Sequence, residues 1–551
     1  MNTQDPPIDK KNPLPYTRLQ VNPKESSHMH KPDYHTYEEY QNRLAKLQEI
    51  SSLGILPYPH TFSPTAEAAP LEAAYAGKSV GDSEAGAQGT TPEVTLAGRL
   101  VLFRAMGKNA FAHLQDGTGR IQLMFNRDLT KVASLSEGEE ITPIKFIEKK
   151  LDLGDIIGVK GHLFTTHKGE LTLFVKELTL LCKTLLPLPD KHSGLANKEL
   201  RYRKRWLDLI SSREVFTTFQ MRSAIVRFAR DFLHAERFME VETPVLQNTY
   251  GGAEARPFTT HINALNQEMF LRISLEISLK KLIVGGYDRV FEIGKVFRNE
   301  GLDKTHNPEF TMLELYGAYL DYHDMMSLTE RLFEGLALQL FGTTKIGKRI
   351  DKSGHEHEID VKAPWKKMTM KESIRHYGHV DVDKLSDESM RSYLLEKTEA
   401  DPKKVQSAPR GILIACLFEE LVEKYLIQPH HIIDHPIETT PLCKLHRNPK
   451  ERKERIVERF ETFILGYEFA NAYSELNDPL LQRELLEAQA AKRATGDEEA
   501  HPMDEEFIEA ICQGMPPTGG LGIGIDRMVM LFTGETSIRD VLFFPIMRPE
   551  E

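Results

Sequence analysis

The sequence predicts an α+β protein, with a small β-barrel in its N-terminal part and a larger domain of mixed helices and strands after it. Between residues 94 and 181, five strand-like runs follow one another with turn residues between them, as in small barrels. After residue 214, helical periodicity alternates with short apolar runs, which indicates helices packed on a sheet. The length of 551 residues also exceeds one ordinary domain.

The first 92 residues are expected to lie outside these two domains. Residues 1–36 are rich in Pro, Asn, Lys and His and lack apolar periodicity, so we expect a disordered extension. Residues 37–53 place apolar side chains at helical spacing. Residues 63–92 consist largely of Ala, Gly, Glu, Ser, Thr and Pro. We therefore expect residues 37–92 to form one helix followed by a low-complexity linker.

Residues 93–185 carry the strand signals. The runs are VTLAGRLVLFRAM, FAHLQD, IQLMFN, DIIGVKGHLFTT and LTLFVKELTLL, with the turns DGTGR and HKGE among them. So many strands in so short a segment favour a Greek-key barrel of the OB-fold type. Residues 186–214, which include Pro187, Pro189 and Gly194, are predicted to be a connector.

Composition and charge exclude several classes of protein. A net charge of −11 argues against a protein coated with basic charge for nonspecific nucleic-acid binding. No apolar run reaches about 18 residues, so no membrane span is expected. The four cysteines show no CxxC spacing, which argues against a zinc site or a disulfide framework and fits the cytoplasm. Neither GxGxxG nor GxxxxGK[ST] occurs, so a nucleotide would not be held by a Rossmann or P-loop cradle.

Three segments of residues 215–551 carry most of the chemistry. Residues 238–246 read FMEVETPVL and lead to a Gly-Gly pair whose backbone can approach a ligand closely. Residues 291–319 form a strand–loop–strand that contains FRNE. Residues 519–534 run a glycine-rich strand, with GIGIDR at its end, into a helix whose arginine can meet phosphate. A helical insertion is expected at about residues 365–435.

These segments, in this order, resemble motifs 1, 2 and 3 of the class II aminoacyl-tRNA synthetases. Together with the barrel, the resemblance extends over residues 37–551. It implies a catalytic domain built on an antiparallel sheet flanked by helices. It also implies that ATP activates an amino acid as its adenylate, which is then transferred to the terminal adenosine of a tRNA. A homodimer formed through motif 1, around Pro244, is part of the same expectation.

The resemblance assigns roles in ATP binding. Arg298 would contact the α-phosphate and the amino-acid carboxylate, and Glu300 would hold the adenine amino group. Phe310 would stack on adenine, with Arg527 on the other face of the base. Arg298 and Arg527 are the predicted catalytic residues, because this chemistry needs positioning and charge stabilisation rather than a protein nucleophile. The predicted ATP-binding residues are Arg298, Glu300, His306, Asn307, Phe310, Glu461 and Arg527.

Two glutamates in RFETFILGYEFANAYSELND are predicted to bind magnesium. Glu461 and Glu468 are seven residues apart, which would place both on one helix face or one strand edge. Two carboxylates there can hold Mg²⁺ through oxygen ligands. We expect more than one Mg²⁺ ion per active site, bridging the ATP phosphates.

The expected amino acid is L-lysine. A lysine pocket must neutralise a compact ammonium group, so it should offer carboxylates. Glu276 in LRISLEISLKKL and Glu475 in NAYSELND match the lysine-specific members of the class, where such acidic positions flank the ε-ammonium and Tyr316 adds a hydroxyl. Glu314 and the Gly252 backbone would hold the α-amino group. The predicted lysine-binding residues are Gly252, Glu276, Arg298, Glu314, Tyr316, Asn471 and Glu475.

Three alternative functions each predict a sequence feature that differs from this chain. Aspartyl- and asparaginyl-tRNA synthetases share the barrel and the motifs, but need cationic or amide-reading groups where this chain has Glu276. A synthetase-like protein that binds RNA without catalysis would be expected to lack Arg298, Arg527 or the magnesium glutamates. Paralogues that attach lysine to a protein lack the N-terminal barrel. The residues therefore favour an enzyme acting on lysine, ATP and tRNA(Lys).

The barrel is expected to bind the anticodon. Phe111 and Gln122 match barrel positions that contact the anticodon in this family. A phenyl ring can stack on an extruded base, and a glutamine can read a base edge. Arg104 and Glu170 are further candidates on the same domain.

Overall fold

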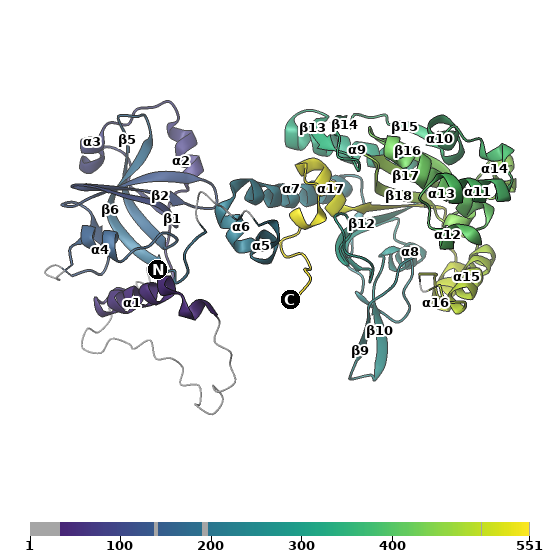
Figure 1. Cartoon of the computed structure of the whole chain (residues 1–551), viewed down its shortest axis with the longest axis horizontal. Coiled ribbons are helices and arrows are strands. Elements are labelled where there is room, and N and C mark those ends of the chain that lie inside the picture. Colours follow the sequence, from purple (N-terminus) through teal and green to yellow (C-terminus); the bar gives the residue numbers. More distant parts are fainter. Residues whose placement is uncertain (1–32, 137–140, 190–194, 196, 498, 550–551) are drawn as a thin grey trace. The chain divides into compact units, whose positions relative to one another are not determined.

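The computed structural model describes residues 33–136, 141–189, 195, 197–497 and 499–549. The chain divides into two compact units, residues 1–194 and 195–551 (Figure 1). Most of the extension predicted to be disordered lies outside the described residues, and its end, Asp33–Thr36, forms the 3-10 helix η2. No helix among the described residues is both long and apolar enough to cross a membrane.

The first unit contains the predicted OB-fold barrel. Its strands run in the order β3-β2-β1-β5-β6-β4, and an additional β3–β6 pairing closes the sheet on itself. Alternation along the strands builds the core, as where Ala110, Ala112 and Leu114 of β2 point inward. The elements are β1 (Val94–Met106), β2 (Asn109–Gln115), β3 (Arg120–Asn126), β4 (Lys131–Val132), α4 (Pro143–Lys149), β5 (Ile156–Thr165) and β6 (Leu171–Cys182).

The structure differs from the linker predicted over residues 63–92. The expected helix α1 (Glu38–Ser52) is followed by two further short helices, α2 (Ala68–Tyr75) and α3 (Ser83–Gln88). The amide of Ala68 donates to Asp116 Oδ2 over 2.7 Å, and a Cβ added at Gly86 would lie about 3.1 Å from Phe164. The small residues that made this segment resemble a linker therefore allow it to pack closely on the barrel.

The second unit is built on an eight-stranded sheet in the order β15-β16-β17-β18-β19-β12-β11-β7. Neighbouring strands are antiparallel except for one parallel pair at each edge, β15–β16 and β11–β7. The prediction of an antiparallel sheet flanked by helices is confirmed. The strands are β7 (Met239–Glu240), β11 (Arg289–Phe297), β12 (Glu309–Ala318), β15 (Lys366–Thr369), β16 (His430–Pro436), β17 (Ile456–Ile464), β18 (Tyr467–Ser474) and β19 (Thr518–Gly524).

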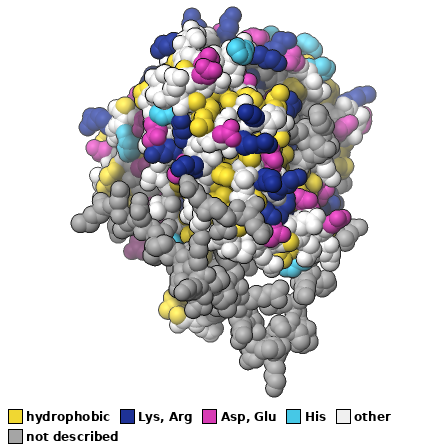
Figure 2. All heavy atoms as spheres, turned by 90° about the vertical axis from the view of Figure 1, so that its left-hand side faces the viewer, with side chains coloured by type: hydrophobic (Ala, Val, Ile, Leu, Met, Phe, Trp, Pro, Cys, Tyr) yellow, Lys and Arg dark blue, Asp and Glu magenta, His cyan; other side chains and the backbone are white. Residues whose placement is uncertain are grey.

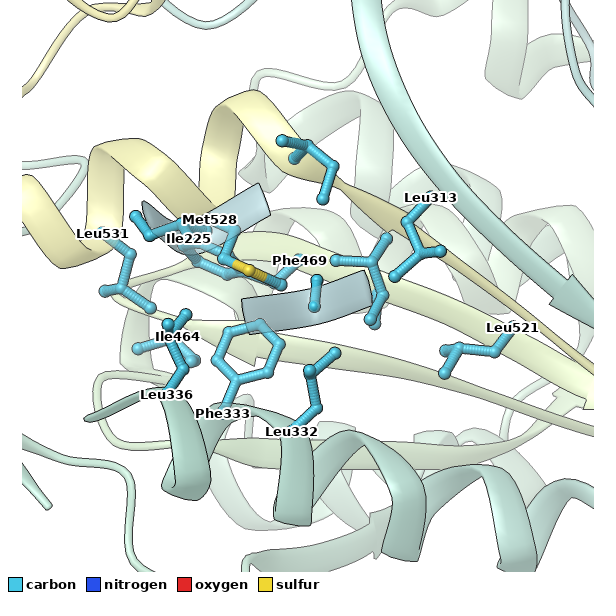
Figure 3. Packing of buried hydrophobic residues seen from close by; sticks show 14 of the residues in the cluster. Ile225, Leu313, Leu332, Phe333, Leu336, Ile464, Phe469, Leu521, Met528 and Leu531 are labelled. Atoms are coloured by element: carbon cyan, nitrogen blue, oxygen red, sulfur yellow. The ribbon is translucent and has the colours of Figure 1, made fainter. Parts of the chain in front are cut away.

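Three helices cover one face of this sheet and bury its largest apolar core. They are α7 (Arg213–Ala235), α9 (Tyr322–Phe341) and α17 (Ile525–Thr533). Figure 3 shows Phe333 of α9 directed toward Phe469 and Met528, with Leu313 and Leu521 from the central strands beyond them. With this face occupied by helices, the opposite face is free for a site.

The remaining elements surround the sheet. The predicted connector, residues 186–214, contains the unit boundary and two short helices, α5 (Lys198–Arg203) and α6 (Arg205–Ser211). The predicted insertion contains four helices with a core of their own, but its two ends, β15 and β16, belong to the main sheet. The other elements are β8 (Leu246–Gln247), β9 (Thr259–Ile262), β10 (Gln267–Leu271), α8 (Glu276–Val284), β13 (Lys345–Ile350), β14 (Glu356–Asp360), α10 (Met370–Tyr377), η3 (Val382–Lys384), α11 (Asp387–Lys397), α12 (Pro402–Gln406), α13 (Arg410–Leu421), η4 (Glu423–Tyr425), η5 (Ile437–Thr439), α14 (Pro449–Lys453), α15 (Pro479–Ala494), α16 (Glu505–Cys512) and η6 (Ile538–Asp540).

Candidate active site

A cavity of about 410 Å³ lies in the second unit, on the sheet face that the core helices leave free. Strand β12 separates the two faces, because Leu313 and Leu315 enter the core whereas Glu314 and Tyr316 line the cavity. The structure brings every residue predicted for ATP, lysine or magnesium to this cavity. These residues are Gly252, Glu276, Arg298, Glu300, His306, Asn307, Phe310, Glu314, Tyr316, Glu461, Glu468, Asn471, Glu475 and Arg527.

The basic end of the cavity is organised by Arg298 and Arg527. Arg298 follows the last residue of β11, donates from Nε to the Ile273 carbonyl over 3.2 Å, and places its Cζ 5.2 Å from the centre of the Phe310 ring. Arg527 donates to the Glu468 carbonyl (2.8 Å) and lies 3.2 Å from Nε2 of His306. The predicted sandwich put Arg527 opposite Phe310 across the adenine, whereas in the structure Arg298 contacts the Phe310 ring. Both guanidinium groups keep unused donors that can meet phosphate.

Glu461 and Glu468 lie on the two strands of a hairpin, not on one helix face or one strand edge as expected. The turn at Leu465 and Gly466, both with positive φ, folds β18 back on β17 and brings both carboxylates to the cavity. Burial raises the pKa of both groups, and the charge of Glu461 raises that of Glu468 further. A divalent cation would relieve this repulsion.

The donor set fits magnesium. Among the described residues, no group of three or more His, Cys, Asp and Glu side chains could hold a metal ion by itself. Magnesium does not need one, because proteins usually bind it through one or two carboxylates together with substrate phosphates. Glu461 and Glu468 supply such a pair.

The acidic end of the cavity contains three buried carboxylates. Glu314 accepts hydrogen bonds from Ser274 Oγ (2.8 Å), the Leu275 amide (3.0 Å) and the Tyr316 hydroxyl (3.1 Å). Burial raises the pKa of Glu314 to about 7, although these donors oppose the rise. Glu276 accepts from the Tyr473 hydroxyl over 2.6 Å. Glu475 Oε2 is paired with the Lys280 ammonium, whereas its Oε1 has no hydrogen-bond partner and is available to a cationic ligand.

Sequence reasoning missed two cations that hold these acidic groups. Lys280 forms ion pairs with Glu276 and Glu475. Arg459 donates to Glu461 Oε1 (2.6 Å) and to Asn471 Oδ1 (3.1 Å), so it orients two predicted site residues. Both have a sequence signal, since Lys280 follows Glu276 by four residues on a helix and Arg459 precedes Glu461 by two on a strand.

Gly520 lines the cavity at a position that leaves no room for a side chain. A Cβ there would lie 1.9 Å from Glu475 Oε1 and 2.6 Å from Cε1 of Tyr316. We expect Gly520→Ala to displace both groups, to lower amino-acid-dependent pyrophosphate exchange about 100-fold, and to cost about 1–3 kcal/mol of folding stability. Exchange kinetics and thermal melting measure the two effects. Gly117→Ala, whose Cβ would meet no atom within 4 Å, is the control, and equal behaviour of the two variants would contradict the prediction.

The barrel brings its candidate residues to one face. Arg104 is paired with Phe111 across β1 and β2, and Gln122 donates to Glu170 Oε2 over 2.7 Å. Phe111 packs on Met124, outside the main barrel core. Figure 2 looks onto the N-terminal unit and shows Lys and Arg side chains scattered among Asp and Glu. Recognition by individual side chains therefore suits this unit better than recognition by a uniform basic surface.

Comparison with known proteins identifies the family. Residues 197–548 match the family described as tRNA synthetases class II (D, K and N), and residues 94–181 match the OB-fold nucleic acid binding domain. The chain belongs to the class II tRNA synthetases. It is 58% identical over 522 residues to a lysine–tRNA ligase of Chlamydia caviae, covering 94% of this chain and 99% of the relative. Lysine–tRNA ligases of Methanoculleus marisnigri and Trichormus variabilis are 46% and 45% identical, covering 92% of this chain and 94% and 87% of their own lengths.

Membership of the class II synthetases agrees with the position of the cavity. The family match spans every strand of the eight-stranded sheet, and the residues of FRNE and GIGIDR that were predicted to bind ATP reach the same end of the cavity. The barrel match coincides with the strands β1 to β6. The first unit of this synthetase is therefore a nucleic-acid-binding domain, and the second unit contains its candidate active site.

Proposed function

We propose that this synthetase is a lysine–tRNA ligase, which activates L-lysine with ATP and transfers it to tRNA(Lys). The charge of the acidic end of the cavity carries the proposal. When all four groups are charged, three carboxylates (Glu276, Glu314 and Glu475) and one ammonium (Lys280) leave two negative charges for a ligand to neutralise. Lysine brings two ammonium groups, and its carboxylate can meet Arg298. Aspartate or asparagine would leave one of these buried charges unpaired, which is costly.

Two groups of residues define the ends of the proposed lysine site. Glu475, whose Oε1 has no hydrogen-bond partner, lies beside Tyr316 where Gly520 leaves room, and these groups would face the ε-ammonium. Glu276, which shares the Lys280 ammonium with Glu475, lies at the same end of the cavity. Glu314 and the Gly252 backbone would hold the α-amino group, with Asn471 near the carboxylate.

The arginine end would bind ATP. Arg298 would bridge the α-phosphate and the lysine carboxylate, so that a carboxylate oxygen attacks phosphorus in line as pyrophosphate leaves. Glu300 and Phe310 would hold the adenine, and Arg527, His306 and Asn307 would serve the phosphates. Glu461 and Glu468 would hold Mg²⁺, more than one ion per site, which offsets the charge that develops on the phosphates. The hydroxyl of the tRNA terminal adenosine would then attack the lysyl-adenylate.

The barrel would read the anticodon through Phe111 and Gln122, assisted by Arg104 and Glu170. We expect Phe111→Ala to raise the KM for tRNA about 10-fold or more in aminoacylation, because stacking on a base contributes roughly 1–3 kcal/mol. Lysine-dependent exchange without tRNA should not change. Leu129→Ala, at an exposed position of the same unit, is the control. An equal loss of tRNA-free exchange would contradict the assignment.

Two further proposals concern the state of the enzyme. We propose a homodimer formed through the segment around Pro244, where Val245 and Leu246 are exposed apolar residues. All four cysteines are free thiols in the structure, which supports a reducing compartment such as the cytoplasm.

Pyrophosphate exchange measured with each of the twenty amino acids tests the proposed function. We expect lysine to support exchange well above every other amino acid, and chelation of magnesium to abolish it. Exchange with aspartate or asparagine but not with lysine would reject the specificity. Absence of exchange with any amino acid, in an enzyme that still binds RNA, would favour the non-catalytic alternative.

A further inference from the structure

Lys280 is a buried cation placed behind the proposed lysine site. Its side chain is 0% exposed and forms ion pairs with Glu276, one turn before it on α8, and with Glu475, which directly follows β18. The ammonium also lies 5.5 Å and 5.8 Å from the ring centres of Tyr473 and Phe507. Lys280 does not line the cavity, so a ligand there would touch its two partners and not Lys280 itself.

We infer that Lys280 is a specificity-determining positioning residue that acts as a counter-cation. Its buried positive charge sets the net charge of the amino-acid site to match an amino acid with two amino groups. This inference rests on the proposed function and assigns Lys280 a part in the recognition of lysine. Lys280 joins two carboxylates from distant parts of the sequence and holds them at one end of the cavity. Its single positive charge leaves two negative charges for the two ammonium groups of the substrate.

Without the Lys280 ammonium, the same carboxylates could not all remain ionised. Burial and the charges of Glu276 and Glu314 raise the pKa of Glu475 well above its ordinary value, and Lys280 is the group that opposes this rise. Removing Lys280 would therefore raise the pKa of Glu475 further and favour its protonated form. A neutral carboxyl attracts an ammonium far less than a carboxylate does, so lysine binding would become dependent on pH.

The neighbours of Lys280 define which groups can titrate. Burial alone would lower the pKa of Lys280, but the charges of Glu276 and Glu475 outweigh it and keep the group an ammonium. Burial and the charge of Lys280 lower the pKa of His501 to about 4, so that histidine is neutral near pH 7. The titratable and charged groups that face this region are Glu276, Glu314, Tyr316, Cys443, Tyr473, Glu475 and His501.

The test compares Lys280→Met with Lys281→Met in the full-length enzyme. Lys281 is the next residue of α8 but pairs with exposed Glu506, so its replacement removes the same charge from the surface. We expect Lys280→Met to raise the KM for lysine about 30-fold or more near pH 7 and to leave the KM for ATP within about twofold. Lys281→Met should behave like the unaltered enzyme.

The pH profile separates a charge effect from a structural one. In the pH range where lysine keeps both ammonium groups, the KM of Lys280→Met should fall as pH rises, because Glu475 ionises. The unaltered enzyme should lose affinity only below about pH 7, where Glu314 takes up a proton. The double variant Lys280→Met with Glu475→Gln restores two net negative charges, and its profile should return toward that of the unaltered enzyme.

Two results would overturn the inference. One is a KM for lysine in Lys280→Met within about twofold of that in Lys281→Met, and the other is a raised KM that does not change with pH. If Lys280→Met melts before the assay temperature, Lys280→Gln, which is neutral and polar, replaces it in the same comparison. The proposed function is tested separately in the same assay, because it requires only that the unaltered enzyme shows lysine-dependent exchange.

Discussion

Replacing Arg298 by lysine is expected to lower kcat/KM for lysine-dependent pyrophosphate exchange about 100- to 1,000-fold while the protein remains folded. Arg298 is the residue proposed to touch both reactants, through the lysine carboxylate and the ATP α-phosphate. A planar fork can donate to both groups at once, whereas a lysine ammonium is a single point charge on a flexible stem. The variant keeps the positive charge, so the loss reports geometry and not net charge.

Exchange kinetics and thermal melting check this expectation. Arg331→Lys is the matched control. Arg331 lies on helix α9 and forms a surface ion pair with Glu236, so the protein should tolerate this change. A fall in kcat/KM of less than about fivefold in Arg298→Lys would mean that a positive charge is sufficient at this position. A large fall in melting temperature would assign Arg298 a structural role through its bond to the Ile273 carbonyl.

The sequence anticipated the residues of the site better than their contacts. FRNE and GIGIDR are short, ordered motifs, and the fold brings Arg298, Glu300 and Arg527 from them to one cavity. The contact of Arg298 with Phe310 was not anticipated, because it depends on the register in which the two strands of motif 2 pair. The hairpin that brings Glu461 and Glu468 together was missed since a spacing of seven fits several local structures.

The sequence did not reveal the residues that orient other residues of the site. Lys280 and Arg459 each bind carboxylates that reach the cavity, and each lies among charged residues that usually belong to a solvated surface. Burial distinguishes them from surface residues, and for Lys280 it depends on a distant segment of the chain, the one that supplies Glu475. The same limit applied to residues 63–92, whose small side chains are equally typical of a loose linker and of a helix packed closely on a barrel.

Replacing Glu475 by glutamine is expected to have the second large effect, and it separates lysine recognition from ATP binding. Glu475 is fully buried, and the change removes one of the two charges available to the substrate while keeping the shape of the side chain. It also leaves Lys280 with a single carboxylate partner, so a cation already buried there would repel the incoming ε-ammonium. We therefore expect the KM for lysine to rise about 100-fold or more, with the KM for ATP changed by less than about threefold.

Steady-state exchange at varied lysine and varied ATP measures both constants. Glu506→Gln, at an exposed site on α16, is the control and should leave both unchanged. Because the double variant with Lys280→Met removes the repelling cation, it should bind lysine more tightly than Glu475→Gln alone, although still less tightly than the unaltered enzyme. If the loss of lysine binding energy in the double variant instead equals the sum of the losses in the two single variants, the two residues act independently. The counter-cation role of Lys280 would then be wrong.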